Sequence, residues 1–362
     1  MNTIAHHDGV VIGGVDTHKD IHVAAVLDNV GRLLGTESFP TTRNGYRRLL
    51  VWLQSHGDLE VVGVEGCGSW GAGLARYLTA RGVRVVEVNR PNRQERRRRG
   101  KSDVLDAEAA ARAVLAGQAT ATPKAGTGPV EALRQLRVAR SGAMKARTAA
   151  ANQIHSLCDT APDEIRAQLT GLTMTKKIAL AERWRPGPSM TPANAAKRAI
   201  ASVARRWRAL DDEARALQAH TKTILDEHAA SLLAVHGVGY DTAAQLLITA
   251  GDNPQRLHHE RSFAALCGAT PVPDSSGRTN GRLRLNRGGD RHANSALWRI
   301  VIVRMATHQE TKTYVERRTK EGMPTIEIIR CLKRYVAREV YPHIQATAHH
   351  HTDALQATTS AA

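Results

Sequence analysis

Aromatic residues are scarce in this chain. Phe, Trp and Tyr make up only 4% of its 362 residues. Proteins that hold single-stranded bases on stacking platforms use clusters of aromatic side chains, and the sequence contains no such cluster. A nucleic-acid-binding role would therefore depend mostly on contacts of Arg and Lys with phosphates and on the shape of the partner.

Cysteines and long apolar runs are also few. The four cysteines are widely scattered and form no CxxC pair, which predicts reduced, buried thiols and argues against a structural zinc site. No apolar run reaches the ~18 residues that a membrane-spanning helix needs. The N-terminus lacks the charged start and apolar stretch of a signal peptide. We therefore expect a cytoplasmic protein without a membrane partner.

Acidic residues are outnumbered by basic ones. The chain has 34 Asp and Glu against 51 Lys and Arg, a formal net charge of +17. This balance predicts a polyanionic partner, with nucleic acid as the first candidate. Two basic stretches are the candidate contact residues for nucleic acid: Arg96, Arg97, Arg98, Arg99 and Lys101 in the first, and Arg278, Arg282, Arg284, Arg287 and Arg291 in the second.

The first third of the chain has the pattern of an α/β domain. Apolar and alternating segments predict five strands, and residues with helical spacing predict helices between and after the later strands. Three consecutive strands followed by alternating helix and strand indicate a mixed sheet flanked by helices. The predicted strands are residues 10–15, 21–27, 32–39, 60–65 and 83–88, and the predicted helices are residues 44–55, 70–80 and 103–115.

After residue 128 the strand signals stop. Residues 121–128 have the composition of a linker, and residues 129–228 predict long helices whose apolar positions alternate in steps of three and four, as in a coiled coil. An intramolecular helical hairpin and a coiled coil that pairs subunits both fit this spacing, which slightly favours the second. Residues 229–345 predict a mostly helical domain with a Pro-, Gly- and Arg-rich loop at 270–291, and residues 346–362 predict a disordered tail.

Four acidic residues form the candidate metal site. Asp16 and Glu65 end two apolar strands, and Asp103 and Asp106 lie three residues apart at the start of a helix, on one face. Four carboxylates suit Mg²⁺ or Mn²⁺, and acids at strand ends and on a late helix are typical of a ribonuclease-H-like domain, here residues 8–120. Each acid alone has an ordinary explanation, because carboxylates favour the first turn of any helix and polar residues end most strands.

Several motifs together resemble one known family. The sequence is similar to the DEDD-type transposases of bacterial insertion sequences, whose elements encode a bridge RNA that guides recombination. The resemblance covers about residues 10–340. It is carried by GVDTHK around Asp16, VEGCGSW around Glu65, VNRP at 88–91, KSDVLDA around Asp103, HGVGYDTA at 236–243, and LCGATP at 266–271 followed by Ser276 and Gly277.

The resemblance implies a mechanism and its residues. Asp16, Glu65, Asp103 and Asp106 would form an acidic tetrad that binds the metal, and Ser276 in a C-terminal transposase domain would attack a DNA phosphodiester to form a phosphoserine link. Ser275 is an alternative nucleophile; Ser276 is favoured because it directly precedes Gly277. The family further implies donor and target DNA, a guide RNA, a homodimer or homotetramer with a site assembled between subunits, and a bacterial, nucleoid-associated location.

Two other functions remain open from the sequence. A metal-dependent, junction-resolving nuclease would use the acidic tetrad without a covalent intermediate, and Ser276 would then be irrelevant. A non-catalytic nucleic-acid binder would need only the basic surface. The family's usual Ala-Thr-Gly-x-Tyr after the first-domain glutamate is here Gly-Cys-Gly-Ser-Trp, so that Trp70 keeps an aromatic side chain at this place.

Overall fold

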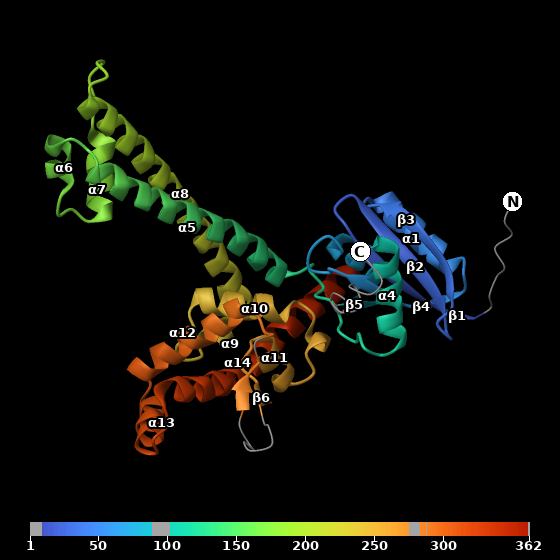
Figure 1. Ribbon diagram of the computed structural model, residues 1–362. Coiled ribbons are helices and arrows are strands. Elements are labelled where there is room, and N and C mark those ends of the chain that lie inside the picture. The colour runs from blue at the N-terminus through green and yellow to red at the C-terminus, as the bar shows by residue number, and fades with distance from the viewer. Residues whose placement is uncertain (1–8, 89–101, 275–282, 287, 361–362) are drawn as a thin grey trace. The chain divides into compact units, whose positions relative to one another are not determined.

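The computed structural model describes residues 9–88, 102–274, 283–286 and 288–360. These residues divide into two compact units (Figure 1). The first unit combines residues 1–128 with residues 250–262, and the second combines residues 129–249 with residues 263–362. No helix in the described part of the chain is both long and apolar enough to cross a bilayer.

The first unit is built on a five-stranded mixed sheet. Strands β1 (Val10–Thr17), β2 (Ile21–Asp28) and β3 (Leu33–Pro40) are antiparallel neighbours, and β4 (Asp58–Glu65) and β5 (Arg84–Val88) continue the sheet parallel to β1. The order across the sheet is β3-β2-β1-β4-β5. The predicted mixed sheet is confirmed, and each predicted strand overlaps an observed one.

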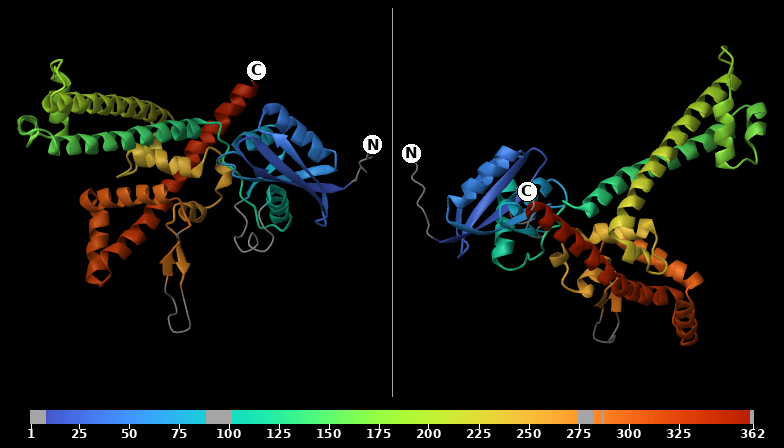
Figure 2. Two further views of the ribbon diagram at one scale, coloured as in Figure 1. Left: turned by 45° about the horizontal axis from the view of Figure 1, so that its top comes forward. Right: turned by 180° about the vertical axis from the view of Figure 1, so that it is seen from behind.

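Helices cover both faces of this sheet (Figure 2). Helices α1 (Arg43–Gln54) and α2 (Ala72–Thr79) bury Leu49, Leu53 and Leu74 with alternate strand residues on one face. On the other face, α4 (Asp103–Leu115) packs its Ala111 against the side chains of Ile12 and Val61. Strand β1 is consequently buried on both sides along almost its whole length, as expected of a central strand.

Two glycines allow α4 to lie close to the sheet. Gly14 on β1 and Gly63 on β4 are paired in register. A Cβ atom at Gly14 would lie 2.3 Å from both the carbonyl oxygen of Ala107 and the amide nitrogen of Ala111, and one at Gly63 would lie 3.0 Å from the carbonyl oxygen of Ala110. Glycine is therefore required at position 14 for the helix backbone to sit where it does.

The segment predicted to be a linker is held by residues that come more than a hundred positions later. The side chain of Asn253 accepts a hydrogen bond from the amide of Ala125 (3.1 Å) and donates one to the carbonyl of Pro123 (3.0 Å). Arg256, in the short helix η1 (Pro254–Arg256), donates to the carbonyl of Thr122 (3.2 Å). These contacts explain why residues 250–262 belong to the first unit, although the sequence placed them in the C-terminal domain.

The second unit contains a long helical hairpin. Helices α5 (Pro129–Asp159) and α8 (Pro192–His228) pack along each other, joined through α6 (Asp163–Leu169) and α7 (Met174–Arg183). The buried positions of α8 include Ile200, Ala204 and Ala214, and the buried carboxylate of Asp211 pairs with Arg147 of α5. The segment with heptad-like spacing thus lies in an intramolecular hairpin, one of the two alternatives that the sequence left open.

The rest of the second unit is mostly helical, as predicted, with two local differences. Residues 270–291 contain a small antiparallel hairpin of three-residue strands instead of only a loop. Residues 346–360 lie in the last helix instead of a disordered tail. The elements are α9 (Ala230–Leu233), α10 (Tyr240–Ala250), α11 (Glu260–Leu266), β6 (Pro271–Pro273), β7 (Leu283–Leu285), α12 (Arg291–Thr307), α13 (Gln309–Lys320) and α14 (Thr325–Ser360).

Candidate metal and nucleic-acid site

Asp16 is a buried carboxylate near the C-terminal end of β1. Its residue surface is only 5% exposed. Side chains two residues apart on a strand point to the same face, so Asp16 shares with Gly14 the face that α4 covers. The close approach of α4 therefore brings the first turn of this helix to Asp16.

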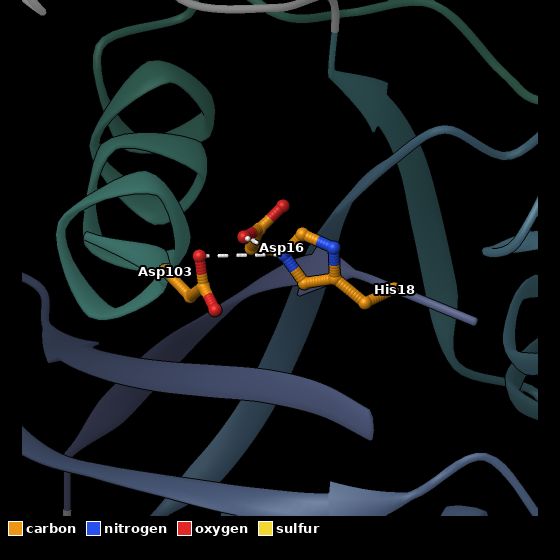
Figure 3. A group of neighbouring side chains, drawn as sticks. All are labelled: Asp16, His18 and Asp103. Atoms are coloured by element: carbon orange, nitrogen blue, oxygen red, sulfur yellow. Dashed lines mark hydrogen bonds and ion pairs between the residues drawn. The ribbon is translucent and has the colours of Figure 1, made fainter. Parts of the chain in front are cut away.

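His18 and Asp103 complete a group of three polar side chains at this place (Figure 3). The amide of His18 donates to the carbonyl of Ile21 (3.2 Å), which closes the turn between β1 and β2. The Nε2 atom of His18 lies 3.1 Å from Oδ2 of Asp16 and 3.4 Å from Oδ1 of Asp103. One ligand atom from each residue lies within 4.8 Å of the other two, so the group could hold a metal ion.

Asp106 adds a further negative charge beside Asp16. It lies in the same first turn of α4 as Asp103 and is buried, whereas Asp103 is exposed. Burial is the main cause that raises the pKa of Asp16; His18 lowers it, and the carboxylates of Asp106 and Asp103 raise it again. The raised pKa means that the surroundings of Asp16 oppose an isolated negative charge and would favour a cation between these acids.

Glu65 ends the neighbouring strand. The parallel register pairs Val15 of β1 with Val64 of β4, so Asp16 and Glu65 follow side by side. The hydroxyl of Thr17 donates to the backbone carbonyl of Glu65 (2.8 Å), which ties the two strand ends together. The Glu65 side chain is half-buried and is not part of the three-residue group. The structure therefore brings the side chains of Asp16 and Asp103 together. The charge of Asp106 acts on Asp16, and the backbone of Glu65 lies beside that of Asp16.

His18 is the member of the group that the sequence did not identify as a site residue. A signal was present, because His18 follows Asp16 by two residues at a strand end, where both side chains can reach one edge of a sheet. The contact of the His18 imidazole with the carboxylates, however, depends on the turn into β2 and on the position of α4. Neither could be read from the sequence near residue 18.

Most of the candidate nucleophile and basic residues lie outside the described residues. Arg284 on β7 is exposed and forms an ion pair with Asp274 (3.5 Å), and Arg291 is the exposed first residue of α12. The structure therefore gives no position for the following candidates: Ser275, Ser276, Arg96, Arg97, Arg98, Arg99, Lys101, Arg278, Arg282 and Arg287.

Two parts of the chain match models of known protein families. Residues 13–161 match a DEDD family model described as a transposase, and this range includes all four candidate acids. Residues 229–316 match a second model, described as the transposase IS116/IS110/IS902 family. Two separate parts of the chain thus match transposase domain models, and both models belong to the IS110 family of insertion-sequence transposases.

Two curated relatives agree with this assignment. An uncharacterized 42 kDa protein of insertion element IS900 from Mycobacterium paratuberculosis is 27% identical over 169 residues, which are 45% of this chain and 40% of the relative. An uncharacterized 43.6 kDa protein of insertion element IS110 from Streptomyces coelicolor is 31% identical over 128 residues, 34% of this chain and 31% of the relative. In each case the match spans less than half of the relative's length.

Proposed function

We propose that this protein is the transposase of an insertion sequence, which cuts and rejoins DNA with the help of a divalent metal ion. The observation that carries the proposal is the convergence of Asp16, His18 and Asp103 at one sheet edge, inside a matched transposase domain. The order β3-β2-β1-β4-β5, with acids at two adjacent strand ends, supports a ribonuclease-H-like fold for this domain.

The residues present fit a hard divalent cation. Asp16 is buried, its burial and two further carboxylates raise its pKa, and the imidazole of His18 is in direct contact with it. Carboxylate oxygens are the ligands that Mg²⁺ and Mn²⁺ prefer, and imidazole is also acceptable to Mn²⁺. We propose Asp16, Glu65, Asp103 and Asp106 as the ligands, with His18 beside them. When bound, the metal would polarise the scissile phosphate and neutralise charge that develops on it.

Ser276 is the proposed nucleophile. Its hydroxyl oxygen would form a bond to phosphorus while the bond from phosphorus to the departing strand's oxygen breaks, and the proton released by the serine would balance the negative charge on that oxygen. The support is its place in the sequence, inside the second matched range and between the segments that form β6 and β7. A serine hydroxyl is a weak nucleophile, so it needs activation by neighbouring groups.

The basic residues are the proposed contacts with the nucleic-acid backbone. Arg284 is exposed on β7, and Arg291 is exposed at the start of α12. The net charge of +17 also supports a polyanionic partner. We include an element-encoded guide RNA and a homodimer or homotetramer in the proposal. With a guide RNA, base pairing would supply the sequence specificity and the protein would hold the backbones.

The covalent protein–DNA link provides the test. Purified full-length protein is incubated with Mg²⁺, element-end DNA and the transcribed flanking RNA, and adducts are separated by denaturing electrophoresis. Wild type and Ser275→Ala should form the adduct, and Ser276→Ala should not. Asp16→Asn should reduce adduct formation about a hundredfold or more, because the charge stabilisation that a metal supplies is worth several kcal/mol.

The exposed Asp20→Asn, four residues from Asp16, is the matched control and should behave as wild type. DNA cleavage without any adduct, and undiminished in Ser276→Ala, would contradict the serine mechanism and leave a metal-dependent nuclease. Cleavage that survives Asp16→Asn would contradict the role of the acidic group.

A further inference from the structure

Trp70 is an exposed aromatic residue in a chain with few of them. The chain has five tryptophans, and the surface of Trp70 is 53% exposed although indole gains more than most side chains from burial. It lies in the turn between β4 and α2, five residues after Glu65.

The turn holds Trp70 in a defined position. The amides of Ser69 and Gly71 both donate to the carbonyl of Gly66 (2.8 and 3.1 Å), and Gly66 has the positive φ of 67° that favours glycine. Cys67 is buried beneath the turn, and its thiol donates to the carbonyl of Val64 (3.3 Å). The turn that carries the exposed indole is therefore fixed by several hydrogen bonds.

Trp70 stands next to the candidate metal group. Its ring centroid lies 6.1 Å from that of His18, with the two rings tilted by 37°. The Nε2 atom of the same ring lies 3.1 Å from the carboxylate of Asp16 and 3.4 Å from that of Asp103. His18 is thus next to both the exposed indole and these two acids.

We propose that Trp70 stacks on an unpaired nucleobase of the DNA strand whose phosphate reaches the acidic group. This inference rests on the proposed function, since the phosphate is what brings a base within reach of the indole. A single indole suffices for one base, and stacking on it is tolerant of sequence because every base has a π-face. In a paired duplex the faces of the bases are covered by their neighbours, so the contact requires an unpaired or extruded base.

The same geometry makes Trp70 a means of holding distorted DNA at the site. A strand that is cut and exchanged has unpaired bases next to the scissile phosphate, whereas an intact duplex has none. Stacking would therefore stabilise the complex with opened DNA over the complex with intact duplex, without reading a particular base. The expected preference is set by the ~1–3 kcal/mol that base–aromatic stacking is worth.

The test compares two DNA probes on the full-length protein. One is a short duplex with a single-stranded gap that contains 2-aminopurine, and the other is the same duplex fully paired. Binding is measured in Ca²⁺, which replaces Mg²⁺ for binding experiments. Trp70→Ala should raise the Kd for the gapped probe about tenfold, equivalent to about 1.4 kcal/mol, and abolish the quenching of 2-aminopurine. It should leave the Kd of the paired probe unchanged, and Trp70→Phe should restore most of the loss.

Trp298→Ala is the matched control. Trp298 is similarly exposed, 46%, but lies on α12 in the other unit, and its replacement should change neither Kd nor quenching. Equal weakening of both probes by Trp70→Ala, or unchanged quenching, would overturn the stacking proposal. A loss of self-association without change in DNA binding would overturn it in favour of a protein contact. Wild-type protein that quenches the gapped probe but never cuts DNA would contradict the proposed function and leave the stacking site standing.

Discussion

Two histidines four residues apart have opposite surroundings. His18 is partly exposed and lies between two carboxylates, whereas His22, on β2, is fully buried and stacks on Tyr46 with ring centroids 5.6 Å apart. Burial, with a smaller contribution from His18, lowers the pKa of His22 from an ordinary 6.5 to about 4. His22 therefore stays neutral in the folded protein at pH values where the unfolded chain becomes protonated.

His22 should make the protein sensitive to acid. Between pH 6.5 and about 4 the unfolded state binds one more proton at this residue than the folded state, so the free energy of unfolding decreases as pH falls through this window. The difference corresponds to an upper limit of about 3 kcal/mol. His22→Phe, which keeps a ring against Tyr46, should remove this part of the pH dependence. Denaturant unfolding at several pH values measures it, with the exposed His258→Phe as control. If the free energy of unfolding depends on pH in the same way in wild type and His22→Phe, His22 does not cause this acid sensitivity.

At the scale of elements, the position of α4 determines the site. The helix carries Asp103 and Asp106, and it can reach Asp16 only because Gly14 and Gly63 present no side chain to it. A contact between a helix backbone and a strand backbone leaves no room for adjustment by side-chain rotation. Small changes on the sheet should consequently be transmitted to the acids.

Gly14→Ala should displace α4. The added Cβ would lie 2.3 Å from two backbone atoms of the helix, and overpacking of this kind destabilises by about 1–3 kcal/mol. We expect DNA cutting and metal binding to be lost even at temperatures where circular dichroism shows the variant folded. Gly9→Ala, at a position with open space, is the control. Wild-type metal affinity in Gly14→Ala would show that the acids do not depend on this packing.

Sequence patterns predicted the first unit better than the second. The strands are long apolar runs bounded by turn residues, and their burial on both faces leaves one interpretation of the pattern. Helices α6, α7 and α13 are short and largely polar. Strands β6 and β7 have only three residues each, and β6 includes two prolines, so local pattern carries little information about these elements. The helical hairpin could not be distinguished from a subunit interface, because both bury the same seam.

At the scale of the whole molecule, each unit is formed from two separate segments of the chain. Residues 250–262 return to the first unit and are fixed there by Asn253 and Arg256. Spacing along the sequence could not predict this, because it results from hydrogen bonds between segments more than a hundred residues apart. The four acids, in contrast, could be proposed from sequence, since their places at strand ends and on one helix face follow from local structure. The contribution of His18 required the folded chain.

Binding of Mn²⁺ by the full-length protein is the most direct test of the metal site at Asp16, because it needs neither DNA nor RNA. Water-proton relaxation or calorimetry gives the affinity for wild type, Asp16→Asn and the exposed control Asp20→Asn. We predict that Asp16→Asn weakens Mn²⁺ binding about tenfold or more, because even the loss of a group that only orients a ligand costs about 10–100-fold. Asp20→Asn should leave the affinity unchanged. Equal affinity in wild type and Asp16→Asn would contradict the assignment of this sheet edge as the metal site.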